Sequence, residues 1–174
     1  MLCLALSAII LLPTSSAYEG SISVIGTKNI SFELISEPEY SISSNASAAM
    51  SIQTISVNST KPDGKNASIM IMSMAIDAEN QTLNNSEFSG FMESMFMGMI
   101  KLANGRELGS IVVANPMGGN VTLHRVVMQS AVNRPANESI MAFWDLDEYN
   151  HVILTSDMDL NATSKIVETL KMLP

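Results

Sequence analysis

Cysteine, basic clusters and catalytic motifs are scarce or missing in this sequence. The only cysteine is Cys3, so no disulfide framework exists, and 9 Lys and Arg stand against 17 Asp and Glu without a basic run. Nucleic-acid binding is not expected, because phosphate contacts need clustered Lys and Arg. The sequence also lacks a Gly-x-Ser-x-Gly elbow, a His-Glu-x-x-His pair and a phosphate-binding loop. These absences favour a protein that is not an enzyme and that needs no cofactor.

The N-terminal segment has the pattern of an export signal. Met1 to Leu12 form an uncharged apolar run, and Ser15-Ser16-Ala17 supplies the small residues that signal peptidase needs. The run is too short to span a bilayer, and Cys3 lacks the residues that precede a lipidated cysteine. We expect residues 1–17 to be a cleaved signal and residues 18–174 to be one globular domain without a transmembrane segment. Export without disulfides is typical of a prokaryotic or archaeal cell envelope.

Asparagines in N-glycosylation sequons are more frequent than chance predicts. Nine sequons are present, whereas the content of Asn, Ser and Thr predicts roughly three. A Ser- and Asn-rich surface can form single sequons by accident, but this density is similar to that of surface glycoproteins of archaeal envelopes. We expect at least seven of the nine to be exposed, with none inside a strand or on the core-facing stripe of the helix. Asn29, Asn45 and Asn161 are expected at a turn, in the Ser-rich segment and at a helix cap, and the other six in connections between elements. The nine are Asn29, Asn45, Asn58, Asn66, Asn80, Asn84, Asn120, Asn137 and Asn161.

A Met-rich strand and a Met-rich helix form the centre of the predicted fold. From Ile69 to Ile76 both alternating faces are largely apolar, which is typical of a strand in the middle of a sheet that is covered on both sides. From about Ser86 to Ala103 apolar residues recur with the helical period, and Asn104-Gly105 can end the helix. Glu93, Met97 and Lys101 lie outside the predicted core-facing stripe. That stripe comprises Phe88, Phe91, Met92, Met95, Phe96, Met99, Leu102 and Ala103.

Hairpins and a terminal helix complete the predicted elements. Ser36 to Ala48 has no sustained period and is predicted to be a loop, whereas Met50 to Val57 alternates weakly as a strand. The turn Pro62-Asp63-Gly64 connects that strand to the central one, with a positive dihedral expected at Gly64. The last helix is predicted over Ala162 to Met172, with Asp159 or Asn161 as its cap. The predicted hairpin strands are 21–25 with 30–35, 108–114 with 121–130, and 139–146 with 151–156.

This order of elements predicts an α+β fold, in which an antiparallel sheet of about seven or eight strands is covered by two helices as an α/β/α sandwich. The chain resembles the PsbP-like family of small exported proteins in three features. These are Ile30 to Leu34 running into Pro38 and Tyr40, the long helix after a central strand, and the closing hairpin before Ser164 to Leu170. The resemblance spans most of residues 18–174, although the Ser-rich segment and the Met content depart from the family's pattern. It implies a binding or accessory protein without a shared active site, so no functional residue is carried over.

The 14 methionines support a second functional interpretation, an exported copper(I)-binding protein. Thioethers are soft ligands that hold Cu(I). Core packing explains most of the same positions, because Met fills irregular gaps and most of these residues fall on predicted core faces. Met97 is the exception, and it is expected to be exposed, to line a contact, or to indicate that the helix is misread. The two closely spaced groups are Met70, Met72 and Met74, and Met95, Met97 and Met99.

Acidic residues near the last helix resemble part of a calcium loop. Asp157, Asp159, Asn161 and Glu168 match four of its positions, but Ala162 stands where that loop needs glycine. Helix capping explains the same acids, since negative charge is favourable at a helix start. We therefore expect no metal site here.

The remaining polar candidates have structural explanations. Asp145, Asp147 and Glu148 are expected to form a solvated hairpin turn. His124 and His151 are expected in strands as surface or satisfied structural groups. Trp144 is expected to anchor the core of the last hairpin, with a sugar-stacking platform as the alternative.

The sequence thus predicts an exported, N-glycosylated envelope protein, secreted or held at the extracellular face, that acts by binding without catalysis. Its partner would be another envelope protein or a surface-layer component. The copper(I)-binding interpretation remains the alternative.

Overall fold

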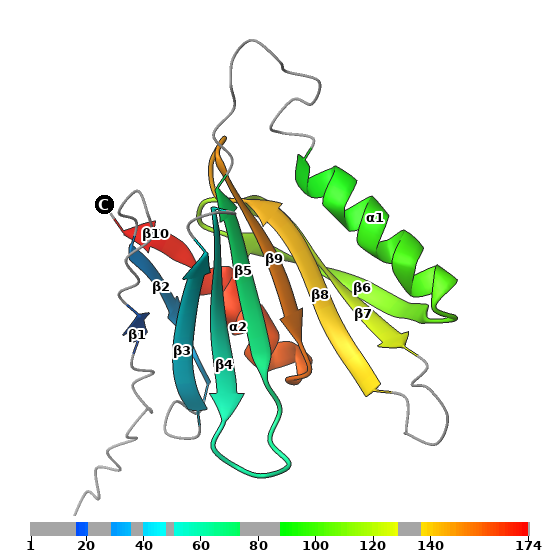
Figure 1. Cartoon of the computed structure of the whole chain (residues 1–174), viewed down its shortest axis with the longest axis horizontal. Coiled ribbons are helices and arrows are strands. Elements are labelled where there is room, and N and C mark those ends of the chain that lie inside the picture. The colour runs from blue at the N-terminus through cyan, green and yellow to red at the C-terminus, as the bar shows by residue number, and fades with distance from the viewer. Residues whose placement is uncertain are drawn as a thin grey trace, which may run out of the picture.

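The computed structural model describes residues 17–20, 29–35, 40–47, 51–73, 88–128 and 137–173 (Figure 1). The side chains of 17–20 and of Asn29 are not part of that description. Two helices are described, α1 (Phe88–Leu102) and α2 (Leu160–Thr169). The strands are β1 (Ala17–Gly20), β2 (Asn29–Glu33), β3 (Tyr40–Ser47), β4 (Ile52–Ser59), β5 (Ala67–Ser73), β6 (Arg106–Asn115), β7 (Gly119–Met128), β8 (Asn137–Asp145), β9 (Asn150–Ser156) and β10 (Lys171–Leu173).

The described strands form a seven-stranded sheet in the order β3-β4-β5-β9-β8-β7-β6 and a three-stranded sheet in the order β1-β2-β10. All pairs are antiparallel, which confirms the predicted α+β class. The predicted hairpins β6–β7 and β8–β9 are both present. The Met-rich strand β5 is interior, as predicted, but the middle strand is β9. In β9 six of the seven residues are buried, as expected of a strand covered on both faces.

One face of the large sheet packs on α2 and the small sheet. Ile55, Ile69, Leu123 and Leu154 of this face are fully buried in one cluster, together with Ile166 of α2. Phe32 of β2 closes the same cluster from the small sheet. Trp144 also belongs to it with 3% of its surface exposed, which confirms the predicted core role.

The opposite face carries α1, which lies across β8 and β9 (Figure 1). We call it the α1 face. A smaller cluster fills this layer, with Val126, Met141, Phe143 and Ile153 from the sheet and Ile100 from the helix. The rings of Phe96 and Phe143 lie 5.5 Å apart between their centroids. The two helices therefore cover opposite faces, as the α/β/α prediction requires.

The core-facing stripe of α1 was predicted only in part: Phe88, Met92 and Phe96 face the core as expected, whereas the other members do not. The helix packs through Phe88, Met92, Phe96, Met97 and Ile100. Met97 is half-buried against the core and so lines the contact between helix and sheet, which was one of its predicted alternatives. Five residues predicted to face the core are exposed instead: Phe91 (50% exposed), Met95 (39%), Met99 (45%), Leu102 (86%) and Ala103, which follows the helix. A helix that is apolar all round gives no polar face by which its inner side could be recognised.

The C-terminal end of the domain was also misassigned. The last helix stops at Thr169, and Lys171–Leu173 forms β10 beside β2, so the predicted helix to Met172 is too long. The N-terminal hairpin pairs β2 with Ala17–Gly20, whereas the predicted strand 21–25 lies outside the described residues. These short strands form the second sheet, which the prediction of a single sheet did not include.

The Ser-rich segment 36–48 contains a strand instead of only a loop. Tyr40–Ser47 is the edge strand β3, paired along its whole length with β4. Ile42 is half-buried on the core side, whereas most of its neighbours are exposed Ser, Asn and Ala. Backbone pairing with β4 therefore makes this strand, because its side chains supply little apolar burial.

The turn before β5 forms where predicted, with a hydrogen bond of 3.0 Å from the Gly64 amide to the Lys61 carbonyl. Gly64 is needed for space and not for a positive dihedral: a Cβ there would lie 1.7 Å from Ser59 Oγ. At the other predicted cap, the Asp159 carboxylate accepts a 2.8 Å hydrogen bond from the Ala162 amide and caps α2. Neither described helix is long and apolar enough to cross a membrane.

Candidate functional site

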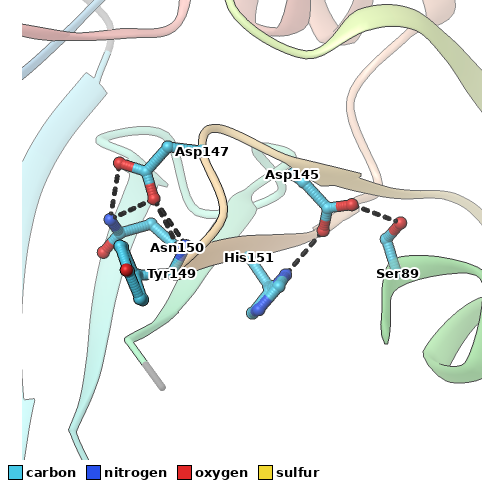
Figure 2. Close-up of polar contacts among 6 residues, drawn as sticks. All are labelled: Ser89, Asp145, Asp147, Tyr149, Asn150 and His151. Atoms are coloured by element: carbon cyan, nitrogen blue, oxygen red, sulfur yellow. Dashed lines mark hydrogen bonds and ion pairs between the residues drawn. The ribbon is translucent and has the colours of Figure 1, made fainter. Parts of the chain in front are cut away.

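A polar cluster joins the β8–β9 hairpin to the start of α1 (Figure 2). Asp145 ends β8, His151 is the second residue of β9, and Ser89 is the second residue of α1. The Ser89 hydroxyl donates to Asp145 Oδ2 at 3.0 Å, and His151 Nδ1 lies 2.6 Å from Asp145 Oδ1. Phe88 packs on the His151 imidazole with 4.5 Å between ring centroids. His151 is 2% exposed, so the cluster is closed from solvent on the histidine side.

These three residue types are those of a nucleophilic triad, but their contacts do not form one. In such a triad the serine hydroxyl bonds to the histidine, which takes its proton. Here both Ser89 and His151 bond to the same carboxylate. His151 Nε2 is buried and has no hydrogen-bond partner among the described residues. The arrangement therefore fixes the first turn of α1 on the sheet rather than activating the hydroxyl.

Asp147 organises the hairpin tip beside this cluster (Figure 2). Its Oδ1 accepts from the backbone amides of Tyr149 and Asn150, both at 2.8 Å, and from Asn150 Nδ2 at 2.7 Å. Glu148 is exposed and raises the pKa of the Tyr149 hydroxyl through a hydrogen bond and its negative charge. The predicted acidic turn is thus divided: Asp147 and Glu148 shape the tip, whereas Asp145 belongs to the interior cluster.

A second buried histidine connects α1 to the far strands. His124 Nδ1 lies 2.8 Å from Glu107 Oε1 of β6, and His124 Nε2 lies 3.0 Å from Glu93 Oε1 of α1. The ring is 8% exposed. Both histidines are therefore structural groups held by carboxylates, as the sequence predicted, but neither is a surface residue.

The methionines fall into two environments. Met70 and Met72 of β5 and Met97 of α1 are half-buried against the cluster under α1. Met95 and Met99 are exposed on the outer side of the helix, whereas Met74 lies outside the described residues. The second predicted group is therefore divided, with Met97 inside and Met95 and Met99 outside, whereas Met70 and Met72 share the layer under α1.

The residues that match a calcium loop also separate. The Asp157 carboxylate accepts a hydrogen bond from the Asn66 amide, and Asp159 caps α2. Asn161 and Glu168 are exposed on α2. No group of His, Cys, Asp or Glu suited to a metal ion occurs among the residues that the structure describes.

Six sequon asparagines have described side chains, and all six are exposed: Asn45, Asn58, Asn66, Asn120, Asn137 and Asn161. Asn80 and Asn84 lie outside the described residues, as does the side chain of Asn29, so the expectation of at least seven exposed sites stays a prediction. Their placement between elements was partly wrong, because four of the six lie in strands and Asn161 lies in α2. Use of the sequons stays a prediction.

The strand asparagines share one face. Core residues alternate with them, since Ile42, Val57, Val121 and Ile140 all point into the cluster that packs on α2. By the two-residue period of strands, Asn45, Asn58, Asn120 and Asn137 project from the α1 face. Glycans at these four positions would therefore project from the α1 face, whereas a glycan at Asn161 would project from α2 on the opposite side.

An ion pair crosses the two strands next to Asn137. Arg125 Nε of β7 donates to Glu138 Oε1 of β8 at 2.7 Å. This hydrogen bond and the guanidinium charge lower the pKa of the Glu138 carboxyl below its ordinary value. Because the folded-state pKa is depressed, any stabilisation is present above the unfolded value of about 4.3 and is lost as the pH falls through the folded value.

We expect a carboxyl NMR titration to find Glu138 below the ordinary glutamate value. Arg125→Gln removes the donor and returns the pKa of Glu138 to that value, whereas Arg106→Gln on β6 leaves it depressed. An unchanged titration in Arg125→Gln would show that the pair is not formed in solution. The effect on stability is small, since both groups are exposed to water.

One polar surface was not predicted from the sequence. Ser56, Ser68 and Thr155 lie side by side on the α1 face, but each sits in an ordinary alternating strand without a recognisable motif. The sequence places Ser and Thr at outward positions of three strands, and only the strand register brings these residues next to one another. No protein-family model and no curated protein matches this chain.

Proposed function

We propose that this chain is an exported, N-glycosylated protein of the cell envelope that acts as a binding or accessory module without catalysis. This proposal rests on the exposure of all six sequon asparagines whose side chains are described. Glycans need positions that project into water, and loops or strand edges with free amide nitrogens provide them. The partner would be another envelope protein or a surface-layer component.

The outer side of α1 supports a binding role. Phe91, Met95, Met99 and Leu102 form an exposed apolar stripe along the helix. Such contiguous apolar surface is uncommon on monomeric proteins and often marks a site of contact with a partner. Lys101 is the only charged residue among the exposed side chains of this helix, so the stripe meets little electrostatic hindrance.

The buried histidine clusters support a non-catalytic role for the same region. Asp145 contacts Ser89 of α1, and Glu93 of α1 contacts His124, so these acids serve contacts between the helix and the sheet. Glu107 holds the other side of His124 within the sheet. A helix that is anchored at both positions presents its outer stripe as a rigid ridge, which lowers the ordering cost of binding.

The mass of the protein from its native source tests the glycan proposal directly. We expect the intact mass to exceed that of the bare polypeptide 18–174, and glycopeptide mapping to find modified Asn45, Asn58, Asn66, Asn120, Asn137 and Asn161. Protein expressed in a bacterial cytoplasm is the matched control for the unmodified mass. A native mass equal to that of the bare chain would overturn the glycoprotein proposal.

A further inference from the structure

A shallow depression of about 270 Å³ lies on the α1 face, where β4, β5 and β9 approach the connection between β4 and β5. One row of its lining follows from the strand register: Ser56 stands opposite Ser68, and Ser68 stands opposite Thr155. Neighbouring strands are about 4.8 Å apart, so the three hydroxyls form an evenly spaced line across the sheet.

A second polar row lies two residues further along each strand. It contains Asn58, Asn66 and Asp157, with Ser139 of β8 beyond them. Two hydrogen bonds hold this row in place. The Asp157 backbone amide donates to the Asn66 carbonyl at 2.9 Å, and the Asp157 carboxylate accepts from the Asn66 backbone amide. The Ser59 amide donates to Asn66 Oδ1 at 2.9 Å, which fixes the orientation of the Asn66 side chain.

The side chains of the first row are free to bind a ligand. No hydrogen bond within the described part of the chain uses the hydroxyls of Ser56, Ser68 or Thr155. The lining is neutral apart from Asp157, and no aromatic residue contributes to it. At about 270 Å³ the depression falls just below the roughly 300–1,000 Å³ of sites for drug-sized ligands. Free hydroxyls in a small depression with a single charged residue suit a small ligand that is itself rich in hydroxyls.

We propose that this depression is a saccharide-binding site and that its occupant is the first part of the N-glycan carried by Asn58 or Asn66. Both asparagines belong to the lining, so a sugar attached to either begins inside the site. Attachment also raises the effective concentration of the saccharide to a level at which weak hydroxyl contacts suffice. The inference rests on the proposed glycosylation, but a saccharide from another molecule would use the same hydroxyls.

The first arm of the test follows attached glycans. The full chain is secreted from a eukaryotic host that adds high-mannose glycans, and the folded protein is digested with endoglycosidase H while site-resolved mass spectrometry follows each sequon. We expect cleavage at Asn58 and Asn66 to be about tenfold slower than at the exposed Asn120 and Asn161, because a docked glycan must first open.

Hydroxyl deletions then separate docking from simple crowding. Ser56→Ala with Thr155→Val keeps every sequon, and it should bring the cleavage rates at Asn58 and Asn66 close to that at Asn120. Ser94→Ala with Ser110→Ala removes two exposed hydroxyls outside the depression and should leave the slow rates unchanged. Slow cleavage that persists in the first double variant contradicts docking of the attached glycan.

The second arm tests a free saccharide. Unglycosylated full chain is titrated with N,N′-diacetylchitobiose at millimolar concentration, and amide NMR shifts are followed. Shifts at Ser56, Ser68 and Thr155 that vanish in Ser56→Ala with Thr155→Val support a saccharide site open to other molecules as well. Protected glycans without such shifts assign the site to the attached glycan. Equal cleavage at all sequons together with no shifts overturns the inference, whatever the native mass shows.

Discussion

Replacing Asn115 with Ala should destabilise the protein by about 3 kcal/mol, because one buried side chain makes four hydrogen bonds that the variant loses. Asn115 Nδ2 donates to the carbonyls of Val167 at 2.6 Å and Leu170 at 2.9 Å, at the end of α2. Its Oδ1 accepts from the amides of Met117 at 2.9 Å and Gly118 at 2.7 Å. One residue thus ties α2 to the β6–β7 turn.

The loss is large because the last carbonyls of a helix have no donor within the helix and depend on other partners. A buried acceptor without a donor costs about 1–3 kcal/mol, and Ala can supply neither pair of bonds. The turn also packs closely on the core: a Cβ at Gly118 would lie 2.4 Å from Trp144 Cδ1, so a shifted turn would disturb Trp144.

Thermal unfolding of the purified variant checks this expectation. For a chain of this size about 3 kcal/mol corresponds to a fall in Tm of about 6–12 °C. Asn120→Ala, an exposed asparagine in the next strand, is the matched control and should change Tm by less than about 2 °C. A Tm of Asn115→Ala equal to that of the control would show that the end of α2 does not depend on this side chain.

Replacing Asp145 with Ala should cost about 2–4 kcal/mol, because His151 and Ser89 both lose their partner. His151 is 2% exposed and its Nε2 has no partner among the described residues, so Nδ1 makes its one hydrogen bond. Without Asp145 an imidazole would remain buried with both nitrogens unpaired. The first turn of α1 would also lose the contact of Ser89 with the sheet.

Asp145→Asn separates hydrogen bonding from charge. Its amide oxygen can accept from His151, and its nitrogen can donate to Ser89, so the variant should lose less than about 1 kcal/mol. Chemical denaturation of both variants and of exposed Glu148→Ala gives the comparison, and Glu148→Ala should change stability by less than about 0.5 kcal/mol. If Asp145→Ala were as stable as Glu148→Ala, the cluster in Figure 2 would not contribute to folding.

The elements that the sequence predicted best are those with a clear period or cap. β4 and β5 alternate, the hairpins β6–β7 and β8–β9 enclose recognisable turn residues, and Asp159 precedes α2 as a cap. Local chemistry specifies each of these, so neighbouring residues are sufficient to identify them. The α+β class follows from their order.

The tertiary structure decided whatever depends on partners far along the chain. The inner side of α1 could not be read, because apolar residues surround the helix and only the sheet selects Phe96 and Ile100 over Phe91 and Leu102. β3 and β10 form by pairing with β4 and β2, and their own side chains supply little signal.

The candidate sites divide in the same way. The sequon asparagines are specified by three residues each, so the sequence determined where glycans could be attached. The row of Ser56, Ser68 and Thr155 depends on the register of three strands, and the contacts of Asp145 with Ser89 and His151 join residues up to 56 positions apart. These residues come together only after the strands have paired into the sheet, because no local pattern encodes which strand becomes the neighbour.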